Sequence, residues 1–259
     1  LSIIDLEENS NQPFEDDKFL ITYNGEIFNY LELKKDLIKK GYLFKTKSDT
    51  EVLLKMYHEY GDKMLSLLNG MWAFCIYNKL NGETFVARDR FGIKPLYYSI
   101  IKGNIYVYSE IKQIKRIINL SYDKENSLDY LFFGRLLHNE QTVFKEVQQL
   151  LPGHAFTKLP GSKLDIFKYY DIPIKQNFNS LNENIETLEW LIKDSINLRL
   201  RSDVELGGLL SGGVDSSILA HYISKSKKDY TGFHFHSEKY DELVYAKKVA
   251  SSNAVSYTH

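Results

Sequence analysis

Short apolar runs separated by polar turns fill the chain up to about residue 174. They predict β-strands at residues 1–6, 19–23, 42–46, 70–77, 83–89 and 105–109, and two more within 155–171 around a Pro-Gly turn. Leucine and isoleucine at helical spacing predict helices at residues 31–40, 51–60 and 110–117, and one or two short helices within 120–139. Because the run 70–77 is almost continuously apolar, we expect its sheet to be covered on both faces.

The remainder of the chain follows a different order. An amphipathic helix at residues 184–201 precedes a strand at 204–210, a helix at 216–226, a strand at 230–235 and a helix at 240–251. This β-α-β-α order predicts the start of a parallel α/β sheet. The stretch 175–184 is rich in asparagine and is predicted to be a linker.

Residues 211–217, with the sequence SGGVDSS, lie between a predicted strand and a predicted helix. Gly212 and Gly213 let the backbone approach an anion closely, and the N–H groups at a helix N-terminus suit a phosphate. A carboxylate such as Asp215 fits beside that anion if it holds a Mg²⁺ that also contacts the phosphates. The alternative is an ordinary turn in which Asp215 and Ser216 cap the helix. The combination of residue types favours a nucleotide pyrophosphate site.

Three polar stretches before residue 100 also carry candidate chemistry. Asn24, Gly25 and Glu26 are predicted at a strand-to-helix corner, where N–H groups and an amide side chain can reach a ligand. Asp49, from the sequence alone, is interpreted as the N-cap of the helix that follows it. The charges of residues 88–98 surround a glycine and a proline, which is compatible with a buried ion-pair corner and with a solvated loop alike.

The chain has 259 residues, of which 43% are apolar and 26% charged, as in a folded globular protein. Its net charge of −1 gives no reason to expect nucleic acid or an anionic membrane as a partner. No apolar run approaches the roughly 18 residues that a membrane helix needs. Cys75 is the single cysteine, which excludes a disulfide within the chain, and its apolar strand indicates a buried small side chain rather than a nucleophile. A cytoplasmic enzyme fits this composition best.

The two ends of the sequence also lead to an expectation. Leu1 lies inside an apolar stretch, and the sequence closes at His259 before the predicted parallel sheet has a second half. We therefore expect the chain to be a fragment that lacks sequence at both ends.

Five motifs occur in one order along the chain, at residues 24–26, 48–51, 70–74, 88–98 and 109–112. Together they resemble the glutaminase domain of class II glutamine amidotransferases. With the 211–217 loop downstream, the chain resembles the glutamine-hydrolysing asparagine synthetase family. The resemblance implies an α+β N-terminal-nucleophile fold, an αββα sandwich, followed by the start of an α/β parallel-sheet nucleotide-binding domain. It implies a glutaminase domain at 1–174, a linker at 175–184 and a truncated ATP-binding synthetase domain at 185–259.

The resemblance implies a nucleophilic cysteine at the mature N-terminus, with its own α-amine as the base. Neither this cysteine nor the arginine that binds the carboxylate of glutamine, which would precede Leu1, is in the sequence. The chain as given is therefore expected to bind glutamine poorly and to hydrolyse none. Leu1 and Ile3 follow the position of that arginine and are expected to contact glutamine.

The other implied glutamine-site residues are present. Asn24 and Gly25 match the residues of the oxyanion hole, Asn24 through its side-chain amide and Gly25 through its N–H. Glu26 and Asp49 match residues that hold the α-amino group of the substrate. A positively charged group on the ligand would explain why two carboxylates face the pocket.

For the second domain the resemblance implies ATP and Mg²⁺. The expected contacts with ATP come from Leu210, Ser211, Gly212, Gly213, Asp215, Ser216 and Phe233, with Asp215 also holding the metal. The side-chain carboxylate of aspartate would attack the α-phosphate, giving an acyl-adenylate and pyrophosphate. Ammonia from the glutaminase, arriving through a tunnel, would then displace AMP and yield asparagine. The residues that select aspartate are expected beyond His259.

Two further hypotheses stay open. A related amidotransferase would amidate another acceptor, such as a sugar or a secondary metabolite, and the full downstream sequence would separate the two. A catalytically silent binding or regulatory protein of this fold would lack the nucleophilic cysteine and metal-dependent ATP binding. The expected partners are the small molecules glutamine, aspartate and ATP, without nucleic acid or membrane, and the protein is compatible with a homodimer.

Overall fold

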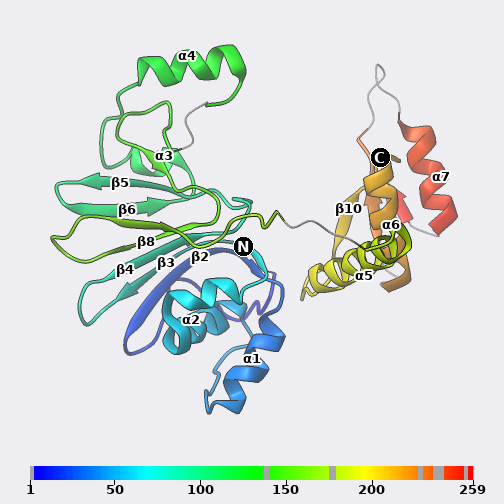
Figure 1. Cartoon of the computed structure of the whole chain (residues 1–259), viewed down its shortest axis with the longest axis horizontal. Coiled ribbons are helices and arrows are strands. Elements are labelled where there is room, and N and C mark those ends of the chain that lie inside the picture. The colour runs from blue at the N-terminus through cyan, green and yellow to red at the C-terminus, as the bar shows by residue number, and fades with distance from the viewer. Residues whose placement is uncertain are drawn as a thin grey trace. The chain divides into compact units, whose positions relative to one another are not determined.

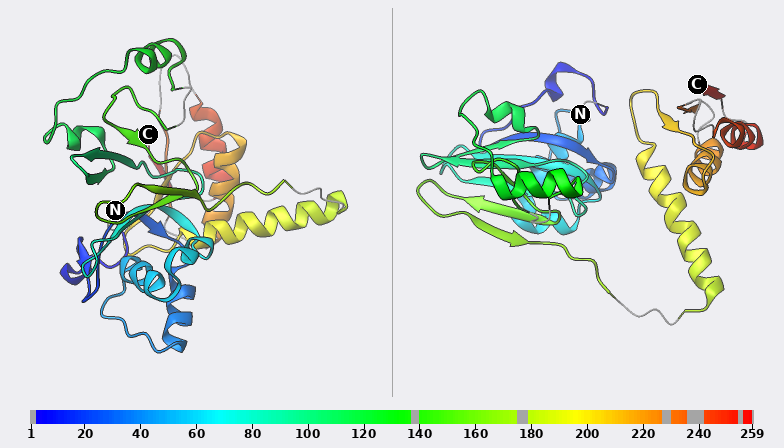
Figure 2. Two further views of the ribbon diagram at one scale, coloured as in Figure 1. Left: turned by 60° about the vertical axis from the view of Figure 1, so that its left-hand side comes forward. Right: turned by 90° about the horizontal axis from the view of Figure 1, so that it is seen from above.

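The chain divides into two compact units, Leu1–Ile174 and Lys175–His259. The structure, a computed structural model, describes residues 3–136, 140–174, 179–226, 230–235, 242–253 and 256–258. Figures 1 and 2 show the two units as ribbons. Within the described residues, no helix combines the length and the apolar character needed to cross a bilayer.

The first unit is built on a six-stranded antiparallel sheet with the order β1-β2-β3-β4-β8-β9. Its strands are β1 (Phe14–Glu15), β2 (Phe19–Ile27), β3 (Gly70–Asn78), β4 (Thr84–Arg88), β8 (His154–Lys158) and β9 (Asp165–Lys168). A second sheet has the order β6-β5-β7 and consists of β5 (Tyr97–Ile101), β6 (Asn104–Tyr108) and β7 (Gln148–Gln149). The helices are η1 (Glu8–Ser10), α1 (Tyr30–Lys39), α2 (Asp49–Tyr60), η2 (Gly61–Ser66), α3 (Ile111–Ile114) and α4 (Lys124–Phe133).

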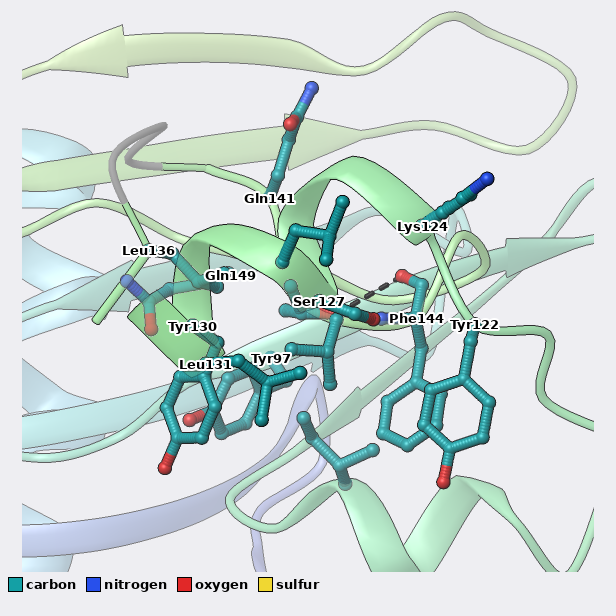
Figure 3. A pocket seen from close by; sticks show the side chains of 14 residues that line it. Tyr97, Tyr122, Lys124, Ser127, Tyr130, Leu131, Leu136, Gln141, Phe144 and Gln149 are labelled. Atoms are coloured by element: carbon teal, nitrogen blue, oxygen red, sulfur yellow. Dashed lines mark hydrogen bonds between the residues drawn. The ribbon is translucent and has the colours of Figure 1, made fainter. Parts of the chain in front are cut away.

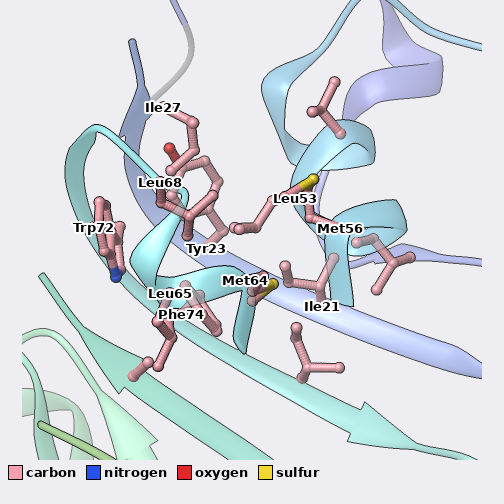
Figure 4. Close-up of a cluster of buried hydrophobic side chains, with 14 of the residues drawn as sticks. Ile21, Tyr23, Ile27, Leu53, Met56, Met64, Leu65, Leu68, Trp72 and Phe74 are labelled. Atoms are coloured by element: carbon pink, nitrogen blue, oxygen red, sulfur yellow. The ribbon is translucent and has the colours of Figure 1, made fainter. Parts of the chain in front are cut away.

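Two apolar layers hold these elements together. One lies between the six-stranded sheet and the helices α1 and α2, with Ile21, Leu53 and Phe74 among its buried side chains (Figure 4). The other lies between the two sheets and includes Val86 and Phe156. Figure 1 shows α1 and α2 on one side of the larger sheet, and the smaller sheet with α3 and α4 on the other. The predicted αββα sandwich is confirmed.

Two predicted strands are wrong, because side chains take over the backbone groups that a strand partner would bind. Residues 3–6 form no strand: Asp5 has a φ of 55°, and its carboxylate accepts the N–H groups of Glu7 and Lys47. Residues 42–46 are irregular, because the Glu51 carboxylate accepts the N–H groups of Lys45 and Thr46. The Glu51 contacts are local, in the manner of caps and turns, whereas the contact of Asp5 with Lys47 joins distant segments of the chain.

The predicted corner at residues 24–26 is also wrong, because β2 continues to Ile27 and pairs along its whole length with β3. An Asn-Gly pair is a turn signal only where no neighbouring strand competes for the backbone. Other boundaries moved less. Helix α3 is shorter than predicted, and helix α2 begins two residues earlier, with Ser48 rather than Asp49 as its N-cap.

Arg88 and Asp89 form a buried corner in which backbone groups satisfy both charges. The Arg88 guanidinium donates to the carbonyls of Gly92, Lys94 and Leu150 at 2.7–2.9 Å. The Asp89 carboxylate accepts four N–H groups, those of Trp72, Phe91, Ile93 and Lys94. The corner is buried, as one of the two interpretations proposed, but its charges hold the loop rather than chiefly each other.

The second unit starts a parallel sheet, as predicted. Its elements are α5 (Leu181–Arg199), β10 (Gly207–Leu209), α6 (Val214–Ser226), β11 (Thr231–Phe233), α7 (Leu243–Asn253) and β12 (Ser256–Thr258). The strands pair in parallel in the order β10-β11-β12. Helix α5 begins at Leu181, earlier than predicted, because Ser180 and Glu183 form a capping box.

The pair formed by Asp16 and His58 predicts a pH-dependent stability. Partial burial opposes ionisation of Asp16, but N–H groups of Phe19 and Lys18 and the His58 ring, 2.6 Å away, hold its pKa below the ordinary value. A lowered pKa in the folded state adds stability above the unfolded pKa, near 3.9, and the gain is lost as the pH falls through the folded value. Asp16→Asn should therefore cost about 1 kcal/mol at pH 7 and progressively less below about pH 4. Urea unfolding, followed by fluorescence of the buried Trp72, measures the difference. A cost that stays constant from pH 7 to pH 2.5 would contradict this origin.

Candidate functional site

The outer edge of β2 directs the Gly25 N–H away from its neighbouring strand. Trp72 lies opposite Gly25 in β3, and both of its backbone groups bind Asp89 on the other side. The Trp72 N–H donates to the Asp89 carboxylate, and the Trp72 carbonyl accepts the Asp89 N–H. Opposite residues in an antiparallel pair alternate between bonded and non-bonded positions, so Gly25 and Trp72 form a non-bonded pair. Tyr23 and Ile27 share the direction of Gly25, and their N–H groups donate to side-chain oxygens of Gln12 and Asp49. The Gly25 N–H thus lies between two N–H groups that face side chains rather than strand β3.

Gly25 also meets a steric requirement. A Cβ at this position would lie 2.2 Å from the Met71 carbonyl oxygen and 2.7 Å from Trp72 Cα. Contacts this short with backbone atoms cannot be relieved by a rotamer change. Only glycine therefore allows β2 and β3 to approach as they do at this point.

A cavity of about 300 Å³ lies beside Asn24, and we call it the Asn24 cavity. Its walls include Tyr23, Ser109 and Cys75. The Asn24 amide donates to Ser109 Oγ at 3.3 Å, which is long for a hydrogen bond. The amide N–H₂ is thus at the cavity wall with a weak partner.

A second cavity of about 300 Å³, the Asp49 cavity, lies beside Asp49 and Asp5. Asp49 Oδ2 accepts the Tyr23 hydroxyl at 2.9 Å and the Ile27 N–H at 3.0 Å. Burial raises the pKa of Asp49 above its ordinary value despite these donors, and burial beside Asp49 raises that of Tyr23 well above its own. A cation bound in this cavity would stabilise the charged carboxylate.

The remaining predicted glutamine-site residues are placed differently. Glu26 is buried in β2 and is not among the residues that line either cavity. Ile4 lines the Asp49 cavity, whereas its neighbour Ile3 does not. Leu1 lies outside the described residues. The structure thus brings Asn24, Gly25 and Asp49 to one edge of β2.

Cys75 is in the middle of β3, with its side chain at the wall of the Asn24 cavity. Burial raises the pKa of its thiol to about 12. The thiolate is the nucleophilic form of cysteine, so this half-buried, neutral thiol is a poor nucleophile. The geometry agrees with the interpretation of Cys75 as a packing residue.

In the second unit, the 211–217 loop connects β10 to the N-terminus of α6. Ser211 Oγ accepts the Gly213 N–H at 3.3 Å and lies 3.0 Å from Ser216 Oγ. Gly212 has a φ of +84°, and a Cβ there would lie 2.5 Å from that of Tyr245 on α7. Asp215 is exposed in the first turn of α6. Hydroxyls, N–H groups and one carboxylate thus gather at a single helix N-terminus.

Two predicted ATP contacts differ in exposure. Leu210 is buried with Ala220, Ala246 and Ala250 and packs inside the unit. Phe233 is 46% exposed at the end of β11. The Leu210 carbonyl accepts the Nδ1–H of the buried His234 at 2.9 Å, which leaves His234 Nε2 as an acceptor with no partner among the described residues. A ligand would therefore meet the Phe233 side chain more readily than that of Leu210.

A larger cavity than these two lies elsewhere in the first unit, beside α4 (Figure 3). It has a volume of about 1000 Å³, and aromatic side chains of Tyr97, Tyr122 and Phe144 line it. Its lining includes none of the predicted site residues. Its lining side chains are mostly apolar or aromatic, so it indicates no specific chemistry.

Gln12, Tyr23 and Asp5 contribute to the two cavities but were not among the predicted site residues. Tyr23 adjoins the Asn-Gly-Glu motif, and this adjacency was the one signal for it in the sequence. Asp5 lies in the run 1–6 that is predicted as a strand, and Gln12 lies in the polar stretch after it. Their positions depend on long-range contacts that no local pattern encodes.

Residues 1–170 match the family of glutamine amidotransferase domains, and residues 187–259 match the asparagine synthase family. Glutamine-hydrolysing asparagine synthetase 1 of Bacillus subtilis is 38% identical, with 97% of this chain and 40% of that protein covered. Putative glutamine-hydrolysing asparagine synthetase 2 of Methanocaldococcus jannaschii is 32% identical, with 100% of this chain and 54% of that protein covered. The chain thus spans about half or less of the length of these curated relatives.

One solved structure, glutamine phosphoribosylpyrophosphate amidotransferase from B. subtilis, aligns with 95% of this chain and 48% of that chain. The TM-score is 0.42 and the sequence identity 18%. A similarity at this level adds nothing to the fold already described.

Proposed function

Because the chain belongs to the family of glutamine amidotransferase domains, we propose that the protein takes nitrogen from glutamine and transfers it to a carboxylate activated with ATP. The match of residues 187–259 to the asparagine synthase family supports aspartate as the acceptor. In this proposal residues 1–174 are the glutaminase domain and 185–259 are the start of the synthetase domain. The substrates are glutamine, aspartate and ATP.

The direction of the Gly25 N–H is the observation that supports glutamine hydrolysis most directly. It points away from β3, and the preceding residue, Asn24, has its side chain at a cavity wall. Two such donors, aimed at one oxygen, stabilise the negative charge that develops when a nucleophile attacks an amide carbonyl. We propose these two groups as the oxyanion hole.

The roles of the other residues at this edge follow from charge. Asp49, held by the Tyr23 hydroxyl and the Ile27 N–H, would bind the α-ammonium group of glutamine. Ammonium binding would offset the burial that raises the pKa of Asp49. Glu26 is buried one residue from Gly25 and would add negative potential near Tyr23, whose pKa it raises. The nucleophile of the proposal is a cysteine at the N-terminus of the mature protein.

The 211–217 loop has the donor groups that a pyrophosphate needs. Serine hydroxyls and N–H groups meet at the N-terminus of α6, where an anion is favoured. Asp215 would supply one ligand to Mg²⁺, which commonly takes one or two carboxylates together with phosphates and water. ATP supplies the leaving group, since its α-phosphate accepts the attacking carboxylate and pyrophosphate departs.

An assay of the protein expressed from its complete gene tests the function. Glutamine, ATP and Mg²⁺ are supplied with and without aspartate, and AMP, pyrophosphate and asparagine are followed. We expect all three products, each dependent on aspartate. AMP formed without aspartate would indicate another acceptor, such as a sugar or a secondary metabolite. ADP in place of AMP would overturn the adenylation, and a gene without an N-terminal cysteine would leave at best an ammonia-using synthetase.

A further inference from the structure

Gln12 occupies the junction between the two cavities at the edge of β2. It lines both the Asn24 cavity and the Asp49 cavity, and among the residues that line them only Tyr23 does the same. A ligand with one end beside Asn24 and the other beside Asp49 would pass this side chain. No sequence motif singled out Gln12, which lies in a polar loop before β1.

The orientation of the Gln12 amide follows from its partner. The Tyr23 N–H is a donor, so the atom that it contacts is the side-chain oxygen, Oε1. Nε2 is bonded to the same carbon and carries two hydrogens that this contact leaves unused. No other hydrogen bond of the Gln12 side chain occurs within the described part of the chain. Gln12 therefore presents an oriented N–H₂ donor at the junction.

This inference rests on the proposed glutamine hydrolysis. We propose that Gln12 contributes to substrate specificity as a second donor to the α-carboxylate of glutamine, from Nε2, in addition to the arginine that the family resemblance implies. The amide end of glutamine would lie at Asn24 and Gly25, and its ammonium group beside Asp49. The carboxylate shares the α-carbon with the ammonium group, so it must lie close to the Asp49 cavity. Because Asp49 and Asp5 line that cavity, a donor on the carboxylate's side, such as Gln12 Nε2, would offset the repulsion between the carboxylate and these two side chains.

The contact with Tyr23 makes this donor pre-organised. The amide plane is fixed by a backbone group of β2, the strand that also contains Asn24 and Gly25. A donor held in place loses little conformational entropy when the substrate binds. The Gln12 donor and the proposed oxyanion hole are thus both positioned by strand β2.

The variant Gln12→Glu tests whether the N–H₂ donor of the Gln12 side chain, rather than its oxygen acceptor, binds the substrate. Glutamate keeps an oxygen for the Tyr23 N–H but replaces the N–H₂ by an anionic acceptor. In the protein expressed from its complete gene, the KM for glutamine should rise about tenfold or more, with kcat within about twofold of the parent. Gln12→Ala should raise KM in the same direction. Neither variant should change kcat/KM for 4-aminobutanamide, which is glutamine without its carboxylate.

Gln141→Glu is the matched control, because it adds the same charge at the cavity beside α4, away from the proposed site. Its kinetics should equal those of the parent, and thermal melting should show all three variants folded. A parental KM for glutamine in Gln12→Glu would overturn the inference. If kcat/KM fell equally for glutamine and for 4-aminobutanamide, Gln12 would have a structural role through Tyr23, and the inference would again be overturned. If the parent protein hydrolysed no glutamine, the proposed function itself would be overturned. That outcome is distinct from the two above, which concern Gln12 alone.

Discussion

Asn24→Ala should lower kcat for glutamine hydrolysis by about 10²–10³-fold in the protein expressed from its complete gene. The loss corresponds to roughly 3–4 kcal/mol, the usual cost of removing one oxyanion-hole donor. The KM should change little, because the amide acts on the charge that develops during the reaction rather than on the bound substrate. Steady-state ammonia release measures both constants.

Asn24→Asp is the stricter version of this experiment. Aspartate keeps the size of the side chain but replaces the donor by a negative charge, so it should be at least as inactive as the alanine variant. Ser109→Ala removes only the 3.3 Å contact of the Asn24 amide and should cost less than about tenfold. A kcat for Asn24→Ala within a factor of three of the parent would remove Asn24 from the proposed oxyanion hole.

Asp215→Asn should lower the aspartate-dependent release of pyrophosphate by about 10²–10³-fold. A carboxylate that holds Mg²⁺ against the phosphates contributes several kcal/mol to the stabilisation of charge at the transition state, and asparagine is a weaker ligand. Ammonia release from glutamine should persist, because Asp215 and the oxyanion donors belong to different units of the chain. Pyrophosphate and ammonia are assayed in parallel on one preparation.

Asp194→Asn, an exposed carboxylate on α5, is the matched control and should leave both activities at the parental level. The informative comparison is the ratio of the two activities. If Asp215→Asn reduced both activities equally, Asp215 would be structural. If raising the Mg²⁺ concentration restored part of the pyrophosphate release, the metal role would be supported.

Much of the fold could be read from the sequence because its cues are local. The Pro-Gly turn lies between β8 and β9 as predicted, and the strand predicted at 70–77 and the helix predicted at 31–40 each lie within one residue of the prediction. The apolar strands predicted a sheet with two covered faces, and the structure has one apolar layer on each side of it. The failures were stretches such as 3–6 and 42–46, where buried carboxylates replaced the expected strand partners.

The candidate site was predicted in its residue types but not in its geometry. Asp49 precedes a helix and is preceded by serine, so a cap was the local interpretation. In the fold, Ser48 takes that role, and the Asp49 carboxylate is free to bind the Tyr23 hydroxyl and the Ile27 N–H. The sequence could not predict Gln12 as a site residue, because nothing in the sequence distinguishes it from other exposed glutamines in polar loops.

The sequence by itself determined where glycine is needed and which chemical groups are available, because residue type sets backbone freedom and donor inventory. Only the tertiary structure decided where those groups point. The direction of the Gly25 N–H depends on its register with Trp72, and Asp89 occupies both backbone groups of Trp72 from the opposite side. A shift of one residue in that register would turn the Gly25 N–H toward β3, with the sequence of β2 unchanged.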